Sequence, residues 1–326
     1  MIITTASTID RGATGLQWRI DLSKIPGIRD VFNSGQDYDF EFFFDPHSLS
    51  DKVTIRYIET QNLLVEDVPV GPQTVRTTNE LVPRIRSKSS IFCDFDEERS
   101  NITSAFPAVS PHTQWINVHD GKELIISDLI GLELSGTRIL ADPRYAWVLN
   151  FNRCNDIALR RFTIGHTKAG YCMGGVLRFQ DCANITIERC DLFGSGTYGL
   201  ELVDCENVEI VGTTVRECTF GAVRLTNVSN AAFRDCEFKK NEGFELFEFD
   251  GRLDGVTLQD CRIFENRIEG AILCFANRNG SGVFVHNSSC TNNQCAEITS
   301  PSNFLGSFDH ESGNQIVPTF WASNRG

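Results

Sequence analysis

The middle of the chain repeats itself with a period of 23 residues. Two columns carry this period, one with Phe179, Leu202 and Leu225 and the other with Asn184, Asn207 and Asn230, and Phe249 extends the first column after 24 residues. Each unit holds three short segments in which apolar and polar residues alternate, as in strands, and none has the length of an amphipathic helix. Because units of this kind bury their apolar faces only by stacking, the repeat predicts a solenoid.

The length of the unit decides which solenoid it is. A propeller blade of four antiparallel strands usually takes about 40 residues or more, whereas three short strands and their turns fit in 23. We therefore expect an all-β, three-faced solenoid of about seven coils, stacked at ~4.8 Å, from about Gln114 to Ile298. The asparagine column favours the same backbone, because Asn tolerates the left-handed conformation needed in a tight turn between faces.

A match in the repeat points to a known family. The segment Cys182-Ala-Asn-Ile-Thr-Ile-Glu-Arg-Cys190 and its asparagine ladder resemble the right-handed parallel β-helix of the pectate-lyase-like superfamily, over residues 114–298. The loop from Gly165 to Gly175 is most similar to uncharacterised bacterial members. The resemblance implies a right-handed parallel β-helix and a carbohydrate-active lyase, hydrolase or epimerase. The sequence departs from the family at its catalytic motifs, since it has no Gly-His-Gly and no Arg-x-Pro-x-x-Arg.

The two ends lack the repeat and are expected to cap the solenoid. We assign residues 1–110 to a β-rich N-terminal cap or small domain, 111–298 to the parallel β-helix and 299–326 to a C-terminal cap or tail. An open solenoid exposes sheet edges and core at both ends, which caps protect. No signal peptide is visible at the N-terminus, which favours a cytoplasmic location and leaves the compartment otherwise unknown.

The charge balance excludes several partners. The chain carries 30 Lys and Arg against 43 Asp and Glu, a net charge of −13. Duplex nucleic acids and anionic membrane surfaces require clustered positive charge, so neither is an expected partner. No apolar run is long enough for a transmembrane helix.

The 12 cysteines do not have metal-binding spacing. No Cys-x-x-Cys occurs, so we expect no metal site. The repeat-phased cysteines share columns with Phe162, Thr213 and Val228, which indicates small side chains in a buried stack. Adjacent cysteines such as Cys182 and Cys205 could approach within disulfide range, although a cytoplasmic location favours reduced thiols.

Outward-facing charges form a row along the first strand of each unit. Arg178, Glu201, Arg224 and Glu248 alternate in sign from coil to coil. One interpretation is a salt-bridge ladder that fixes the register of the coils. The other is a strip that binds carbohydrate.

The candidate site lies around an insertion in the repeat. The step from Phe151 to Phe179 takes 28 residues, and the extra residues must enter the turn between Ile164 and Val176, because a slip within a strand would turn every side chain to the other face. Loops on a rigid scaffold often carry function. We expect His166 and Asp191 as catalytic residues, His166 as acid/base or ligand and Asp191 orienting it. The expected substrate-binding residues are Tyr171, Tyr198, Glu217 and Lys240.

Two functions remain open. The first is a carbohydrate-active protein that acts on or binds a polysaccharide or oligosaccharide along a β-helix face, and if it is an enzyme it is a polysaccharide lyase, glycoside hydrolase or epimerase. The second is a non-catalytic recognition or assembly module. The sequence names no cofactor and does not decide the oligomeric state. A cluster of charged and aromatic groups at one place favours the first hypothesis, and uniform charge ladders favour the second.

The repeat predicts a circular dichroism spectrum dominated by β signal. Since coils of this length leave no room for helices, helix should account for well under about a quarter of residues, below the level typical of soluble domains. A fitted helix content above that level in far-UV spectra of the full chain would contradict the solenoid.

Overall fold

The chain forms two compact units, Met1–Gly71 and Pro72–Gly326. The computed structural model describes residues 37–42, 51–56, 70–168, 170, 173–276, 282–300 and 307–317, and of 37–42, 51–56 and 70–72 the backbone alone. In the first unit, β1 (Asp37–Phe42) pairs antiparallel with β2 (Asp51–Arg56), in register from Asp37 opposite Arg56.

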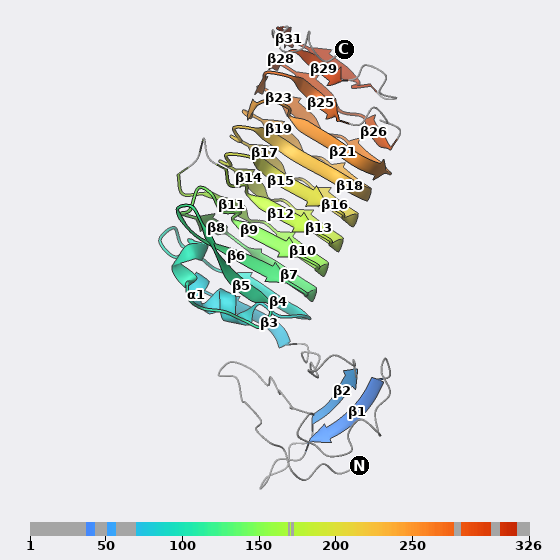
Figure 1. Cartoon of the computed structure of the whole chain (residues 1–326). Helices are drawn as coiled ribbons and strands as arrows, with labels where there is room; N and C mark the ends of the chain where they lie inside the picture. The colour runs from blue at the N-terminus through green and yellow to red at the C-terminus, as the bar shows by residue number, and fades with distance from the viewer. Residues whose placement is uncertain are drawn as a thin grey trace. The chain divides into compact units, whose positions relative to one another are not determined.

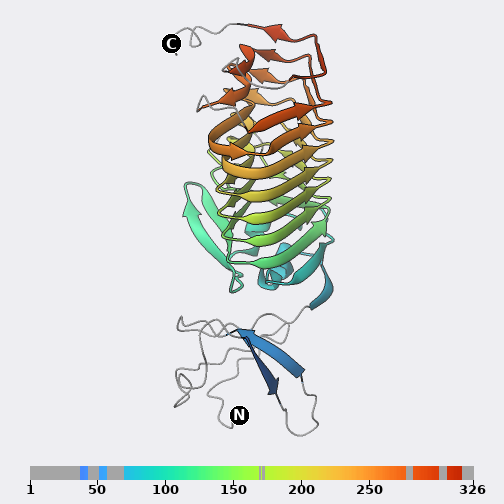
Figure 2. The ribbon, with the colours of Figure 1, turned by 90° about the vertical axis from the view of Figure 1, so that its right-hand side faces the viewer.

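The second unit is a parallel β-solenoid of about seven turns, which confirms the predicted fold (Figure 1, Figure 2). Its first face contains β6 (Gly121–Ser127), β9 (Leu149–Asn152), β12 (Leu177–Gln180), β15 (Tyr198–Val203), the first halves of β18 (Gly221–Arg234) and β21 (Phe247–Asp254), β25 (Ala271–Phe275) and β29 (Glu297–Ser300). The second face contains β4 (Ser89–Cys93), β7 (Ile130–Gly136), β10 (Asn155–Arg160), β13 (Ala183–Glu188), β16 (Glu206–Val211), the second half of β18, β22 (Val256–Gln259) and β26 (Val283–His286).

The third face is built from short strands of three or four residues. It contains β8 (Arg138–Ala141), β11 (Thr163–His166), β14 (Asp191–Phe193), β17 (Thr214–Arg216), β19 (Glu237–Lys239), β23 (Arg262–Phe264), β27 (Ser289–Thr291) and β30 (His310–Ser312). The later coils add a small fourth sheet, which the sequence did not predict, of β20 (Glu242–Gly243), β24 (Arg267–Ile268), β28 (Gln294–Cys295) and β31 (Gln315–Ile316).

The parallel sheets extend past the boundaries that the sequence suggested. At the start, β4 pairs with β7, so residues before 110 already belong to the second face. At the end, β30 and β31 continue the third and fourth sheets beyond 298. The expected boundaries at 110 and 298 therefore do not coincide with the ends of the sheets.

Short helices, together with β3 (Val70–Val75), lie at the N-terminal end of this unit. They are α1 (Thr78–Leu81) and the 3-10 helices η3 (Val82–Arg84) and η4 (Ile102–Ala105). The Thr77 side chain caps α1 by accepting the amide proton of Glu80 at 3.2 Å. Leu81, Val82 and Ile102 are buried in the same core as the coils, so these helices cover its first turn. An antiparallel hairpin of β5 (Thr113–Val118) and β6 follows them.

Like side chains stack on one another inside the coils. The Phe151 and Phe179 rings, one coil apart, lie parallel with centroids 4.8 Å apart. In-register pairing of Phe179 with Leu202, and of Leu202 with Leu225, produces the 23-residue column found in the sequence. The 23-residue repeat thus arises because equivalent core side chains stack from coil to coil.

The asparagine column forms the expected ladder. Asn184, Asn207 and Asn230 have left-handed φ angles of 56°, 55° and 52°. Their amides join the coils, Asn207 donating to Asn184 and Asn230 to Asn207, each at 3.2 Å. The ladder starts at Asn155, which accepts from Asn184 at 2.8 Å, while its neighbour Asp156 takes the left-handed φ.

A second asparagine ladder is buried beside the fourth sheet, and the sequence did not reveal it. It consists of Asn241, Asn266, Asn293 and Asn314. The Asn266 amide donates to the carbonyl of Phe238 and to Asn293 Oδ1, both at 2.9 Å, and its Oδ1 accepts the backbone N–H of Asn241 at 3.0 Å. Each side chain therefore satisfies backbone groups that the turn leaves unpaired.

The two ladders should differ in their importance for stability. Asn266→Ala leaves buried donors and acceptors without partners and should lower the free energy of unfolding by about 3 kcal/mol. Asn207→Gly is the matched change in the exposed ladder. Glycine keeps the left-handed backbone, as Gly255 does in a later coil, so its cost should stay below about 1 kcal/mol. Urea unfolding measures both, and equal costs would contradict the structural role of the buried ladder.

Candidate functional site

A row of polar side chains lines the outer surface of the first face. Parallel register sets Asn150, Arg178, Glu201, Arg224 and Glu248 one above another. Glu123 on β6 continues the row, since its Oε1 accepts from the Asn150 amide at 2.7 Å. We call these six residues the charge ladder.

Ion pairs run through the charge ladder from coil to coil. Arg178 Nε lies 2.8 Å from Glu201 Oε2, and Arg224 Nη1 lies 3.6 Å from Glu201 Oε1. The Nε of Arg224 also lies 3.7 Å from Glu248. The alternation of sign predicted from the sequence is thus a connected network.

The central carboxylate of the network is almost covered. Glu201 is only 7 % exposed, and Glu123 is similarly buried. Burial raises the pKa of both carboxyl groups, and for Glu201 the neighbouring Arg178 and Arg224 partly offset this effect. A carboxyl group with a raised pKa can take up and release a proton nearer neutral pH than an exposed one.

Aromatic rings border the charge ladder where the chain enters the first face. We call Trp147, Tyr198, Phe220 and Phe244 the aromatic edge. The Tyr198 and Phe220 ring centroids are 5.4 Å apart, and those of Phe220 and Phe244 are 5.2 Å apart, so one ring follows another coil by coil. Phe220 is 38 % and Phe244 53 % exposed, which leaves apolar ring surface facing solvent.

Glycines make room for these rings. A Cβ on Gly175 would lie 2.0 Å from the Trp147 ring, and one on Gly221 would lie 2.8 Å from the Tyr198 ring. Both glycines therefore permit a contact between backbone and ring that no other residue allows.

The aromatic edge and the charge ladder form one surface. The Arg224 guanidinium lies 5.9 Å from the Tyr198 ring centroid, and Arg178 lies 5.9 Å from the Trp147 ring. The Tyr198 hydroxyl donates a hydrogen bond to Glu248. Burial, with that carboxylate next to it, raises the pKa of Tyr198, so its proton stays in place.

Of the expected site residues that the structure describes, Tyr198 alone lies on this surface. Glu217 and Lys240 lie just after the third-face strands, at exposed turn positions with φ of 57° and 55°. The Glu217 carboxylate is 2.8 Å from the Arg216 guanidinium. Tyr171 lies outside the residues that the structure describes.

His166 and Asp191 are held apart by separate partners. His166 is 2 % exposed, and its Nε2 lies 3.1 Å from the Gly175 carbonyl oxygen. Asp191 binds the Arg216 guanidinium through both oxygens, each at 2.8 Å. Among the described residues no hydrogen bond or ion pair joins His166 to Asp191, and their catalytic roles stay predictions.

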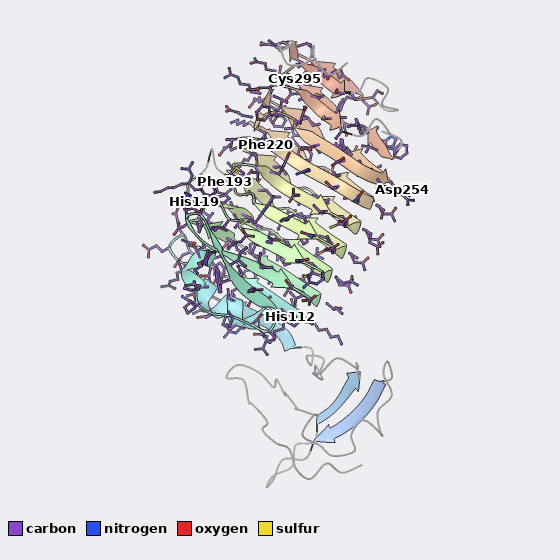
Figure 3. The ribbon with its side chains drawn as sticks, viewed as in Figure 1. His112, His119, Phe193, Phe220, Asp254 and Cys295 are labelled. Carbon is purple, nitrogen blue, oxygen red and sulfur yellow. The ribbon has the colours of Figure 1, made fainter. Side chains whose placement is uncertain are left out.

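Trp147, Phe220 and Phe244 were not predicted from the sequence as residues of this surface. A signal was present, because Phe220 and Phe244 are 24 residues apart and each adjoins a glycine, Gly221 and Gly243. Figure 3 places Phe220 and Phe193 on the same side of the ribbon as His119, away from Asp254 and His112. Only the fold separates the aromatic residues that turn outward from those in the core.

The second face carries a shallow open groove of a different character. Small side chains, Ala158, Thr186 and Ala232, form its floor beside the exposed asparagine ladder. Its lining contains no aromatic ring, so it offers fewer means of holding a ligand than the first face.

Two further kinds of feature are absent from the described part of the chain. No group of three or more His, Cys, Asp or Glu side chains there could hold a metal ion. None of the described helices has the length and apolar character required to cross a membrane.

Comparison with known families identifies the architecture. A family model described as "Right handed beta helix region" matches residues 149–316, and the chain belongs to this family. No curated protein sequence matches the chain.

Solved structures with a similar fold include several proteins named for carbohydrate chemistry. The A-module of the Azotobacter vinelandii mannuronan C-5 epimerase AlgE6 is 14 % identical, with a TM-score of 0.40 over 76 % of this chain and 72 % of that one. A putative glycosyl hydrolase from Parabacteroides merdae is 12 % identical, with a TM-score of 0.24 over 52 % and 80 %. The catalytic domain of a GH87 alpha-1,3-glucanase, in complex with tetrasaccharides, is 10 % identical, with a TM-score of 0.27 over 76 % and 53 %.

The buried His166 should make stability depend on pH. Burial lowers its pKa below the usual 6.5, an effect that the Gly175 carbonyl and Asp120 partly oppose. As pH falls through 6.5 the unfolded chain takes up this proton before the folded one does, so the folded state loses stability.

The His166→Gln variant should therefore lose part of this pH dependence. The slope of the free energy of unfolding against pH should differ between wild type and variant. Just below the usual histidine pKa this difference should reach at most about 1.4 kcal/mol per pH unit. Urea unfolding from acidic to neutral pH measures it, with the exposed His119→Gln as control. Identical slopes for wild type and His166→Gln would contradict a pKa lowered by burial.

Proposed function

We propose that the protein binds a polysaccharide along the first face of its β-helix, on the surface formed by the charge ladder and the aromatic edge. The observation that carries this proposal is the row of rings beside the row of charges. Pyranose rings present apolar C–H faces and polar hydroxyl edges. Exposed aromatic rings pack against the first, and carboxylates and guanidinium groups hydrogen-bond the second.

The repeat of the surface favours a polymer over a small molecule. The exposed rings of Phe220 and Phe244 lie 5.2 Å apart in neighbouring coils, and the nearly buried Tyr198 ring lies 5.4 Å from Phe220. Glu201, Arg224 and Glu248 stack in the same coils. A ligand made of similar units in a row can make the same contact on each coil. A chain lying along the solenoid axis satisfies this condition.

An enzymatic role rests on a narrower observation. Glu201 and Glu248 lie two coils apart on this face, which corresponds to roughly 9.6 Å by strand spacing. That is near the upper end of the ~6.5–9.5 Å separation of carboxyl groups in inverting glycosidases. Arg224 lies between the two and pairs with both, an arrangement that also suits a non-catalytic binding module.

A binding experiment tests the proposal directly. Native affinity electrophoresis through gels that contain neutral or anionic polysaccharides should show retardation of the wild-type chain by at least one polymer. The double variant Phe220→Ala/Phe244→Ala should bind that polymer roughly tenfold or more weakly, since each ring contributes about 0.5–1.5 kcal/mol.

The second face supplies the matched control. Phe284 is also an exposed phenylalanine, on β26, so Phe284→Ala removes a similar ring away from the proposed surface. It should leave retardation unchanged. Equal weakening by both changes, or no retardation by any polymer, would refute binding at the first face. New reducing ends, or absorbance of unsaturated uronates, in the same mixtures would favour the enzyme over the non-catalytic module.

A further inference from the structure

Two pairs of cysteines stand directly one above the other at the corners of the coils. Cys154 and Cys182 precede β10 and β13, and the Cys154 backbone N–H donates to Cys182 Sγ at 3.2 Å. Cys236 and Cys261 precede β19 and β23 in the same relation, with the Arg262 N–H donating to the Cys236 carbonyl at 2.8 Å. All four thiols are free and buried.

The spacing of the coils puts each pair within reach of a disulfide bond. Neighbouring strands lie ~4.7–4.9 Å apart, and disulfides join residues whose Cα atoms are roughly 4.4–6.8 Å apart. All four thiols donate to backbone carbonyl oxygens. The neighbouring thiol lowers the pKa of Cys182 and of Cys261.

Two other thiols in the same columns are placed differently. Cys190 has Phe162 on one side and Thr213 on the other, and its N–H donates to the Thr213 hydroxyl at 3.3 Å. Cys205 follows Cys182 in its column and is the one competitor there among the described cysteines. The N–H to sulfur contact marks the Cys154–Cys182 pair as the closer one.

We propose that Cys154–Cys182 and Cys236–Cys261 are oxidation sites, at which a hydroperoxide converts two stacked thiols into a disulfide that joins neighbouring coils. In the first step the sulfur of Cys182 attacks hydrogen peroxide and becomes a sulfenic acid, with release of water. In the second step the thiol of Cys154 attacks that sulfur, the S–S bond forms and a second water leaves. Cys261 and Cys236 follow the same two steps. Each disulfide thus consumes one peroxide.

A small oxidant suits these sites. Cys154 and Cys182 are 3 % and 2 % exposed, and Cys236 and Cys261 are 1 % exposed, so an oxidant that reacts with them has to be small. In the coil after Cys261, the equivalent position is Ser288, and its hydroxyl accepts the Cys261 backbone N–H at 3.0 Å. Cysteine-to-serine changes therefore keep the corner hydrogen bond and the fold.

The experiment treats the reduced full-length chain with hydrogen peroxide under native conditions. Remaining thiols are then blocked with N-ethylmaleimide in denaturant, and tryptic peptides are mapped without reductant. Cleavage after Arg153, Arg178 and Arg189 puts Cys154 and Cys182 on separate peptides, so a cross-link between them is seen directly. We expect cross-linked peptides for both pairs and the loss of four thiols.

Two serine variants make the assignment specific. Cys182→Ser should abolish the first cross-link and leave the Cys236–Cys261 link intact, and Cys205→Ser should leave both. Sulfinic acids in place of the two cross-links, or a Cys182–Cys205 link as the main product, would overturn the proposal. So would intact thiols at all four positions after peroxide treatment that oxidises the denatured chain.

Discussion

The stacking of each coil on the next in parallel register is the constraint on which the rest of this structure depends. Strand ladders satisfy the backbone along the faces, but every corner leaves amides and carbonyls that the ladders do not reach. Side chains of the next coil fill this need: Cys182, Thr213, Asn241 and Ser288 each accept a backbone N–H from the coil before. The mixture of Cys, Thr, Asn and Ser in these columns follows from one shared hydrogen-bonding role.

The same register creates the candidate binding surface. Equivalent positions of successive coils stack on one another. Outward-facing side chains of the same kind at these positions therefore form a row along the solenoid axis. Arg178, Glu201 and Arg224 become a connected charge network, and Phe220 beside Phe244 becomes a continuous apolar border. A surface made this way is repetitive by construction, which is the property that a polymeric ligand requires.

The coil could be predicted from the sequence because residues that stack on one another in neighbouring coils recur at a fixed spacing along the chain. The column of Phe179 and Leu202, the asparagine ladder and the alternating charges all occur as expected. The partners of the expected catalytic residues were harder to predict. His166 turned inward to the Gly175 carbonyl and Asp191 joined Arg216, partners that no local pattern indicates.

The sequence by itself determined the period, the solenoid and which strand positions face outward, because in-register stacking makes each of these a matter of spacing. Only the tertiary structure decided which aromatic rings are exposed and which cysteine sulfur accepts a backbone N–H from the neighbouring coil. It also decided that Glu201 is nearly buried between two arginines. These properties depend on side chains from different coils and corners meeting in space. Burial and pairing are set by those neighbours rather than by the residue type alone.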